Sequence, residues 1–159
     1  MTPVFVEAKV DIRRSPEDVF DYACDPSREP EWNPMMKRIV KLTEEPLAVG
    51  ARYRTEFAQG PAMVIECIGY DRPSEWSFEG DSRALKAASR GRVVPAPEGS
   101  HLVMWMELEP RGVLKLARPL LRRRLTSMFQ QDVDNIRTRL EAVEGATPGS
   151  PRGSTHPDA

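Results

Sequence analysis

The segment from residue 36 to residue 109 has the pattern of consecutive β-strands, and this run constrains the fold more than any other feature. Its strand candidates either alternate apolar and polar residues or carry apolar residues on both faces, and turns containing Pro or Gly separate most of them. They are residues 36–42, 52–57, 62–70, 75–79, 84–94 and 101–109. Because no helical pattern interrupts the run, its connections are short, and the sequence predicts an antiparallel sheet.

The residues before this run add one strand and two short helices. Residues 4–12 alternate apolar and polar side chains, which predicts a further half-buried strand. Ser15 can then accept a hydrogen bond from a free backbone N–H, Pro16 has the backbone angle of a first helical turn, and Asp18 can reach back to complete a capping box. A proline-rich stretch around Trp32 predicts a second short helical turn.

The segment from residue 112 to residue 143 is different, because its apolar residues recur every three or four positions. This spacing predicts a long amphipathic helix that bends or restarts at Pro119, whose ring removes a backbone hydrogen bond. Residues 1–144 therefore form one predicted domain. Residues 145–159 are rich in Pro, Gly, Ser and Thr, and we expect a disordered C-terminal tail there.

The composition excludes several classes of function. The formal net charge of the 159 residues is -1, which argues against a nucleic-acid partner. The two cysteines, Cys24 and Cys67, lie too far apart in sequence for a metal motif and are expected to be free thiols, and only two histidines are present. We therefore expect no metal and no cofactor. The chain has no signal peptide or transmembrane pattern, so a cytoplasmic location is expected.

The order of strand, two short helices, six strands and one long helix resembles the START-like superfamily, also called SRPBCC, in its polyketide cyclase/dehydratase-like branch. The residues that carry the resemblance are Val10-Asp11-Ile12, Ser15-Pro16-Glu17-Asp18-Val19-Phe20-Asp21-Tyr22, Asp25-Pro26, Glu31-Trp32-Asn33-Pro34, Val49-Gly50-Ala51, Tyr70-Asp71-Arg72-Pro73 and Leu120-Leu121-Arg122-Arg123-Arg124-Leu125. The likeness covers about residues 4–143. It implies an α+β helix-grip fold, in which a curved antiparallel sheet of about seven strands wraps around the long C-terminal helix.

A helix-grip fold implies a cavity between the sheet and the long helix, which members of this family use for lipids, sterols, polyketides or other apolar molecules. The residues expected on the cavity side are Trp32, Tyr53, Thr55, Phe57, Trp76, Phe78, Leu85, Ala87, Ser89, Met104, Met106, Leu121, Leu125, Met128 and Phe129. Trp32 is placed at the cavity mouth. The alternative for each of these side chains is ordinary core, which is the commoner role of an inward apolar residue because every domain buries such residues. The faces of residues 62–70 stay open, since both are apolar.

The main functional hypothesis is that the chain binds a small hydrophobic molecule, lipid-, sterol- or polyketide-like, in this cavity. An alternative is a polyketide aromatase/cyclase or dehydratase, which needs an acid or base beside the substrate. Tyr53, Thr55 and Ser89 are the catalytic candidates, and the interior otherwise lacks acid–base groups. A second alternative is a protein-interaction or chaperone-cofactor domain that uses the open face of the sheet.

A basic cluster, Arg118, Arg122, Arg123 and Arg124, is a possible site for an anionic partner. The partner would be an anionic headgroup, a carrier protein with a phosphopantetheine arm or a membrane surface. Alternatively, these arginines form the solvated face of a helix and pair with acidic neighbours. The acidic residues later in the helix, which weaken the membrane hypothesis, are Asp132, Asp134, Glu141 and Glu144.

Overall fold

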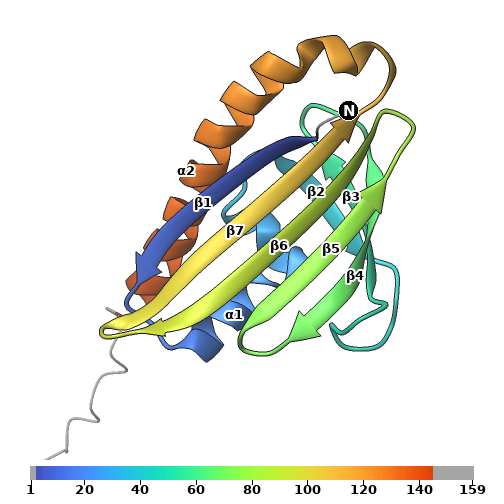
Figure 1. The fold of residues 1–159 in the computed structure, drawn as a ribbon. Helices are drawn as coiled ribbons and strands as arrows, with labels where there is room; N and C mark the ends of the chain where they lie inside the picture. The colour runs from blue at the N-terminus through green and yellow to red at the C-terminus, as the bar shows by residue number, and fades with distance from the viewer. Residues whose placement is uncertain (1–2, 145–159) are drawn as a thin grey trace, which may run out of the picture.

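The structure, a computed structural model, describes residues 3–144 and contains a seven-stranded antiparallel sheet. The strands are β1 (Val4–Ile12), β2 (Met36–Lys41), β3 (Arg52–Phe57), β4 (Met63–Asp71), β5 (Glu75–Asp81), β6 (Leu85–Ala96) and β7 (Gly99–Pro110). Their order across the sheet is β1-β7-β6-β5-β4-β3-β2, so the first strand pairs with the last (Figure 1). The predicted tail, residues 145–159, lies outside the described residues.

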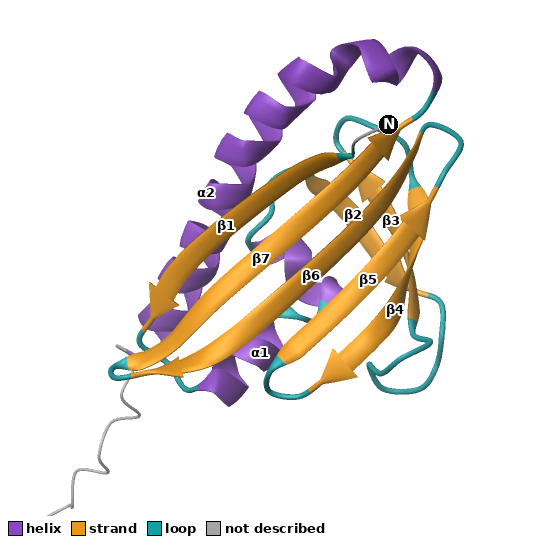
Figure 2. Ribbon diagram, in the orientation of Figure 1, coloured by secondary structure: helices purple, strands orange, loops and turns teal. Residues whose placement is uncertain are grey.

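Within the described residues, four helical segments complete the fold: α1 (Pro16–Ala23), α2 (Arg118–Glu144) and the 3₁₀ segments η1 (Pro26–Glu31) and η2 (Gly112–Ala117). Figure 2 shows both α-helices behind the curled sheet, on the side opposite its convex face. This is the predicted helix-grip architecture. The sheet curls because antiparallel strands twist with a fixed hand, and the helices fill part of the hollow that this leaves.

The start of α1 agrees with its sequence signal in one part and differs in another. The Ser15 hydroxyl accepts a hydrogen bond from the Asp18 backbone N–H at 3.2 Å, as predicted. The Asp18 carboxylate does not close a capping box. It accepts two hydrogen bonds from the Arg14 guanidinium, at 3.1 and 2.9 Å, because a charged guanidinium is a stronger partner than a backbone amide.

The main core lies where the second half of α2 packs against the concave face of the sheet. Val133 and Ile136 are 0% exposed, and they belong to the same cluster of buried side chains as Val6, Ala8 and Val10 of β1. The first half of α2 is less well packed, since no residue from Arg118 to Met128 is fully buried. One end of the hollow is therefore closed by packing, and the other end keeps space between helix and sheet.

The helix restarts where Pro119 predicts. The 3₁₀ segment η2 ends at Ala117, and Pro119 is the second residue of α2, where its missing N–H breaks no helical hydrogen bond. None of the helices within residues 3–144 is both long enough and apolar enough to cross a bilayer.

The register also settles the faces of β4. Met63 and Cys67 are buried on the concave face, whereas Val64 and Ile68 are 41% and 47% exposed on the convex face. An irregularity between Cys67 and Gly69 shifts the alternation, so that the Tyr70 ring packs edge-on against Phe20 at 5.4 Å. The sequence of β4 is therefore apolar on both faces because Val64 and Ile68 are exposed on the convex face.

Candidate functional site

A cavity of about 320 Å³ lies between the sheet and the first half of α2. Its volume falls within the range of small-molecule sites in proteins, about 300–1,000 Å³. The cavity residues outside the predicted set are Glu29, Asn33, Met35, Met36, Gln59, Gly60, Pro61, Met63, Ile65, Glu79, Gly80, Ala88, Leu108, Pro110, Leu114 and Asp132. Most of the wall is apolar, and no Lys, Arg or His among the described residues contributes to it.

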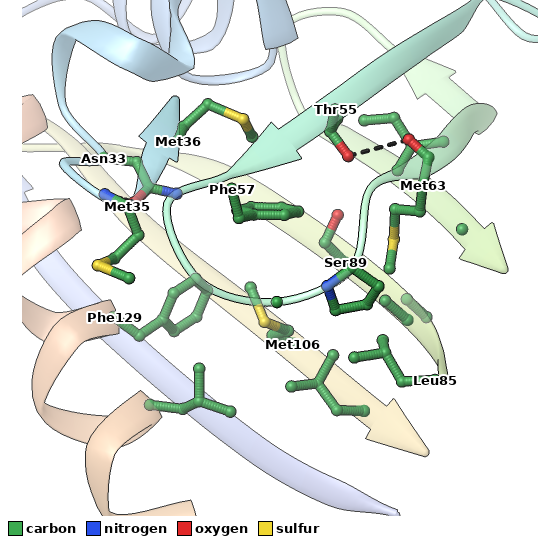
Figure 3. Close-up of a pocket in the computed structure, with 18 of the residues that line it drawn as sticks. Asn33, Met35, Met36, Thr55, Phe57, Met63, Leu85, Ser89, Met106 and Phe129 are labelled. Atoms are coloured by element: carbon green, nitrogen blue, oxygen red, sulfur yellow. Dashed lines mark hydrogen bonds between the residues drawn. The ribbon is translucent and has the colours of Figure 1, made fainter. Parts of the chain in front are cut away.

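Several separate elements supply the walls. Figure 3 shows Phe57 of β3, Met106 of β7 and Phe129 of α2 around a common space, with Met35 and Met36 on the side of the short helices. Unbranched methionine side chains adapt to irregular shapes, so a wall with Met35, Met36 and Met106 can adjust to different occupants. The geometry is therefore that of an apolar binding site with adaptable walls.

Eleven of the fifteen residues predicted for the cavity line it. They are Thr55, Phe57, Phe78, Leu85, Ala87, Ser89, Met106, Leu121, Leu125, Met128 and Phe129.

The other four, Trp32, Tyr53, Trp76 and Met104, lie in the packed core instead of on the cavity wall. The Trp76 ring packs edge-on against Phe20 of α1 at 5.4 Å, so α1 fills the hollow at that end of the sheet. Trp32 is 5% exposed, and its carbonyl accepts a hydrogen bond from Asn135 of α2 at 2.9 Å, which is an anchoring contact and not a place at the mouth. The alternation identified the concave face but not which end of it the helices fill.

Three acidic residues line the cavity, contrary to the expectation of an interior poor in acid–base groups: Glu79, which is exposed, and Glu29 and Asp132, which are not. Asp132 of α2 is only 7% exposed, and its carboxylate has no hydrogen-bond partner among the described residues. Glu29 of η1 accepts a hydrogen bond from the Asn33 amide at 2.8 Å. Asn33 is itself held by the Met35 backbone N–H, which donates to its side-chain oxygen at 3.0 Å. Asn33 therefore holds the Glu29 carboxyl in place, whereas the Asp132 carboxyl is available to hydrogen-bond with a bound molecule.

The surroundings of both carboxyl groups disfavour their charged forms. Burial raises the pKa of Asp132 to about 7, and the negative charge of Glu29 contributes to the same rise. Burial also raises the pKa of Glu29 to about 7, against the opposing effect of its hydrogen bond from Asn33. Both groups can therefore exchange protons near neutral pH inside an apolar cavity.

Residues 3–141 match the family model described as "Polyketide cyclase / dehydrase and lipid transport". The chain belongs to this family. Relatives from Mycobacterium tuberculosis and Mycobacterium bovis are each 25% identical to it over 144 residues. The matches cover 88% of this chain and 86% of each relative, and both relatives are described as uncharacterized.

Solved structures share the fold at low sequence identity. The Zhui aromatase/cyclase from Streptomyces sp. R1128 has a TM-score of 0.76 at 14% identity, over 92% of this chain and 98% of that one. A START superfamily protein from Mycobacterium smegmatis has a TM-score of 0.69 at 18% identity, over 87% and 98%. The di-domain aromatase/cyclase StfQ of the steffimycin biosynthetic pathway has a TM-score of 0.73 at 16% identity, and the match covers 91% of this chain but only 53% of StfQ. The START-like resemblance seen in the sequence is confirmed.

In this member of the polyketide cyclase/dehydrase and lipid transport family, the three hydroxyl candidates lie in different surroundings. Tyr53 is 1% exposed in the core, and burial raises the pKa of its phenol to about 12. The Thr55 hydroxyl lines the cavity but donates to the Met63 carbonyl at 3.0 Å, which ties it to the neighbouring strand (Figure 3). Ser89 lines the cavity, and its hydroxyl has no hydrogen-bond partner among the described residues.

The sequence did carry a signal for Asp132 that grouping it with the other acidic residues of the helix missed. Asp132 lies three residues after Phe129, four after Met128 and four before Ile136, so it falls on the apolar stripe. A charged residue on that stripe has to be buried. Glu29 gave no comparable signal, because it lies in a proline-rich turn whose packing depends on the whole fold.

The remaining reactive groups lie outside the cavity wall. Cys24 and Cys67 are free and buried, and burial raises the pKa of both thiols, that of Cys24 to about 12. His101 bonds with its Nδ1 to the Asp11 carboxylate at 2.6 Å, across the β1–β7 pair. Within residues 3–144, no group of three or more His, Cys, Asp or Glu is arranged to hold a metal ion.

Proposed function

We propose that this chain binds a small hydrophobic molecule, of lipid-, sterol- or polyketide-like character, in the cavity between the sheet and α2. The observation that carries the proposal is a cavity of about 320 Å³ whose wall is mostly apolar, in a family described as acting in polyketide cyclisation and lipid transport. Contact with an apolar occupant removes the exposed wall from water and so stabilises the complex.

The charges on the wall also select the polar end of the occupant. Glu29, Asp132 and the exposed Glu79 line the cavity, and no cationic side chain of residues 3–144 does. A carboxylate placed beside two acidic groups in an apolar environment loses its hydration and meets like charge. The ligand therefore has a neutral or cationic head, and an anionic head is disfavoured.

Binding is tested with ligands of one alkyl chain that end in an alcohol, an ammonium or a carboxylate group, by displacement of a fluorescent apolar probe. We expect the carboxylate to bind at least about tenfold more weakly, a factor that corresponds to about 1.4 kcal/mol. Ala87→Phe places a ring in the cavity, whereas Lys86→Phe, one residue earlier on β6, places the same ring on the exposed convex side. The proposal requires that Ala87→Phe abolish binding and that Lys86→Phe retain it. Equal binding by both variants contradicts it.

A second candidate function is catalysis of the aromatase/cyclase or dehydratase type, and the Glu29–Asp132 pair favours it. In such a reaction the Asp132 carboxylate accepts a proton from a carbon between two carbonyl groups, and the resulting carbanion attacks another carbonyl of the chain to form a ring bond. Asp132 returns that proton to the new alkoxide, which becomes a hydroxyl group. In the dehydration, the protonated form of Glu29 donates a proton to this hydroxyl, which leaves as water, while the Asp132 carboxylate takes the second proton from the attacking carbon and a carbon–carbon double bond forms. A proton passed from Asp132 to Glu29 restores both groups. Groups with a pKa near the working pH are the most effective in such steps.

The catalytic candidate is tested with a poly-β-keto substrate mimic and product analysis by mass spectrometry. Asp132→Asn and Glu29→Gln keep the shape of each side chain and remove its proton exchange. Both variants should retain binding of an alkyl alcohol and lose cyclised product by about 10²-fold or more. An unchanged product profile in both variants refutes catalysis by this pair, and only the binding function then remains. Spontaneous cyclisation is measured in buffer without protein.

A further inference from the structure

The segment formed by η2 and the first half of α2 combines exposed apolar side chains with concentrated positive charge. Val113 is 84% exposed, Leu116 is 88% exposed and Leu120 is 62% exposed. Side chains three apart share a face in a 3₁₀-helix, and side chains four apart share a face in an α-helix. The spacing 113, 116, 120 therefore forms one apolar stripe across the junction of η2 and α2.

The charge on this segment is unopposed. Between Glu109 and Asp132 the chain has six basic residues and no acidic one. They are Arg111, Lys115, Arg118, Arg122, Arg123 and Arg124. Arg111 pairs with Asp81, but the other five form no ion pair with any side chain that the structure describes.

Several arginines elsewhere in the chain are paired, whereas Arg38, Arg52 and Arg137 form no ion pair with any described side chain. Arg72 makes two hydrogen bonds of 2.7 Å to Asp21, Arg14 binds Asp18, and Arg92 pairs with Glu75. The sequence alternative expected a solvated helix face paired with acidic neighbours. Arg122, Arg123 and Arg124 do lie on a solvated face, but no described acidic side chain pairs with them. The acidic residues of the helix lie in its second half, two or more turns beyond Arg124.

We propose that the face formed by Val113, Leu116 and Leu120 with the basic residues from Lys115 to Arg124 docks onto a membrane surface that contains anionic lipids. Apolar side chains that project into solvent and are flanked by arginines suit the boundary between acyl chains and anionic headgroups. An acidic protein would use the arginines but gives no role to three leucine and valine side chains exposed by more than half. A second copy of the chain would bring two cationic segments together, and their repulsion opposes that contact.

The docking face also adjoins the cavity. Leu114 and Leu121, on the same two segments, line the cavity wall, and in Figure 1 the first turns of α2 arch over one end of the sheet. A membrane contact here brings the cavity close to the bilayer. The docking proposal goes beyond ligand binding and does not require it, because vesicles without added ligand test it.

The test is flotation of the full chain with phosphatidylcholine vesicles, with and without about 30% phosphatidylserine, at low and high salt. We expect binding to the anionic vesicles that falls as salt rises. Arg122→Glu/Arg123→Glu/Arg124→Glu should weaken it by about a hundredfold or more, since each basic residue near the surface contributes roughly a fivefold factor. Leu116→Ser/Leu120→Ser should weaken it by at least about tenfold while keeping all the charge.

A control variant separates the proposed face from net charge. Arg38→Glu/Arg52→Glu/Arg137→Glu changes the total charge by the same amount at exposed positions outside the segment. It should retain most of the vesicle binding. All the substituted side chains are exposed, so the variants should keep the melting temperature of the parent chain.

The depth of insertion gives a second, independent measurement. The native Cys24 and Cys67 are 3% and 1% exposed, so a new cysteine in L116C can be labelled selectively with an environment-sensitive dye. The dye should shift to shorter wavelength on anionic vesicles, and the same dye at R137C should not.

Three results would overturn the proposal. One is the absence of binding to anionic vesicles by the parent chain. Another is an equal loss of vesicle binding in the arginine variant and in its charge-matched control. The third is a concentration-dependent dimer, or a complex with an acidic carrier protein, that Leu116→Ser/Leu120→Ser disrupts while vesicle binding is unchanged. Loss of ligand binding in the cavity, measured separately by probe displacement, affects only the proposed function.

Discussion

The buried carboxyl of Asp132 should make the stability of this protein fall as the pH rises, and Asp132→Asn should remove the part of that dependence that Asp132 contributes, leaving the part due to Glu29. The folded chain holds the proton of this carboxyl up to a pKa of about 7, whereas the ordinary pKa of an exposed Asp is 3.8. Between these two values the folded state binds a proton that the unfolded state has lost. The free energy of unfolding therefore decreases with pH across this window and levels off above it.

The size of the effect follows from the window. Each pH unit inside it changes the free energy of unfolding by about 1.36 kcal/mol. Between pH 5 and pH 8, the free energy of unfolding changes only up to the folded-state pKa of about 7. The Asp132 carboxyl therefore lowers the free energy of unfolding of the parent by about 3 kcal/mol over this range. The side-chain amide that the substitution introduces has no such titration. Its own burial cost of about 1–3 kcal/mol is the same at both pH values and cancels in the comparison.

The assay is urea unfolding of the parent and of Asp132→Asn at pH 5 and at pH 8, followed by circular dichroism. The stability of the variant relative to the parent should increase by about 3 kcal/mol between the two pH values. Glu29 is the titratable neighbour that raises the pKa of Asp132, so Glu29→Gln and the double variant measure the coupling between them. Asp134→Asn, two residues along the same helix and partly exposed, is the matched control. If the difference in stability between Asp132→Asn and the parent is the same at both pH values, Asp132 does not hold a proton in the folded state near neutral pH.

Three further predictions concern the packing and the cap of α1. Ile136→Ala should lower the free energy of unfolding by about 2–5 kcal/mol, because Ile136 is 0% exposed. Leu125→Ala should lower it by only about 1–2 kcal/mol, because Leu125 is partly buried at the cavity. Urea unfolding measures both. Gly91→Ala should destabilise by about 1–3 kcal/mol, since its Cβ would lie 2.1 Å from Cζ2 of Trp76, and a lowered melting temperature would show it. Ser15→Ala should cost about 1 kcal/mol through the lost N-cap, and Ser15→Asp should restore most of it in the same measurement.

The element order could be predicted because local rules govern it. Alternation with a period of two marks each strand, the Ser15-Pro16 signal marks the start of α1, and Pro119 marks the restart of the last helix. The pairing of β1 with β7, by contrast, joins residues about a hundred positions apart. No local pattern marks this pairing, and the family resemblance implied only a curved antiparallel sheet of about seven strands.

The sequence by itself determined which side chains share a face, and the tertiary structure decided what each face does. Trp76 and Phe78 lie on the same side of β5, two residues apart, yet one packs against α1 and the other lines the cavity. Alternation cannot separate them, because it records direction and not the position of a helix across the sheet. In the same way, Asp132 was visible as an acidic residue of the last helix. Only the packing of that helix in the tertiary fold, where Asn135 also donates to the Trp32 carbonyl, put its carboxyl beside Glu29, in a cavity where burial makes a proton at neutral pH favourable.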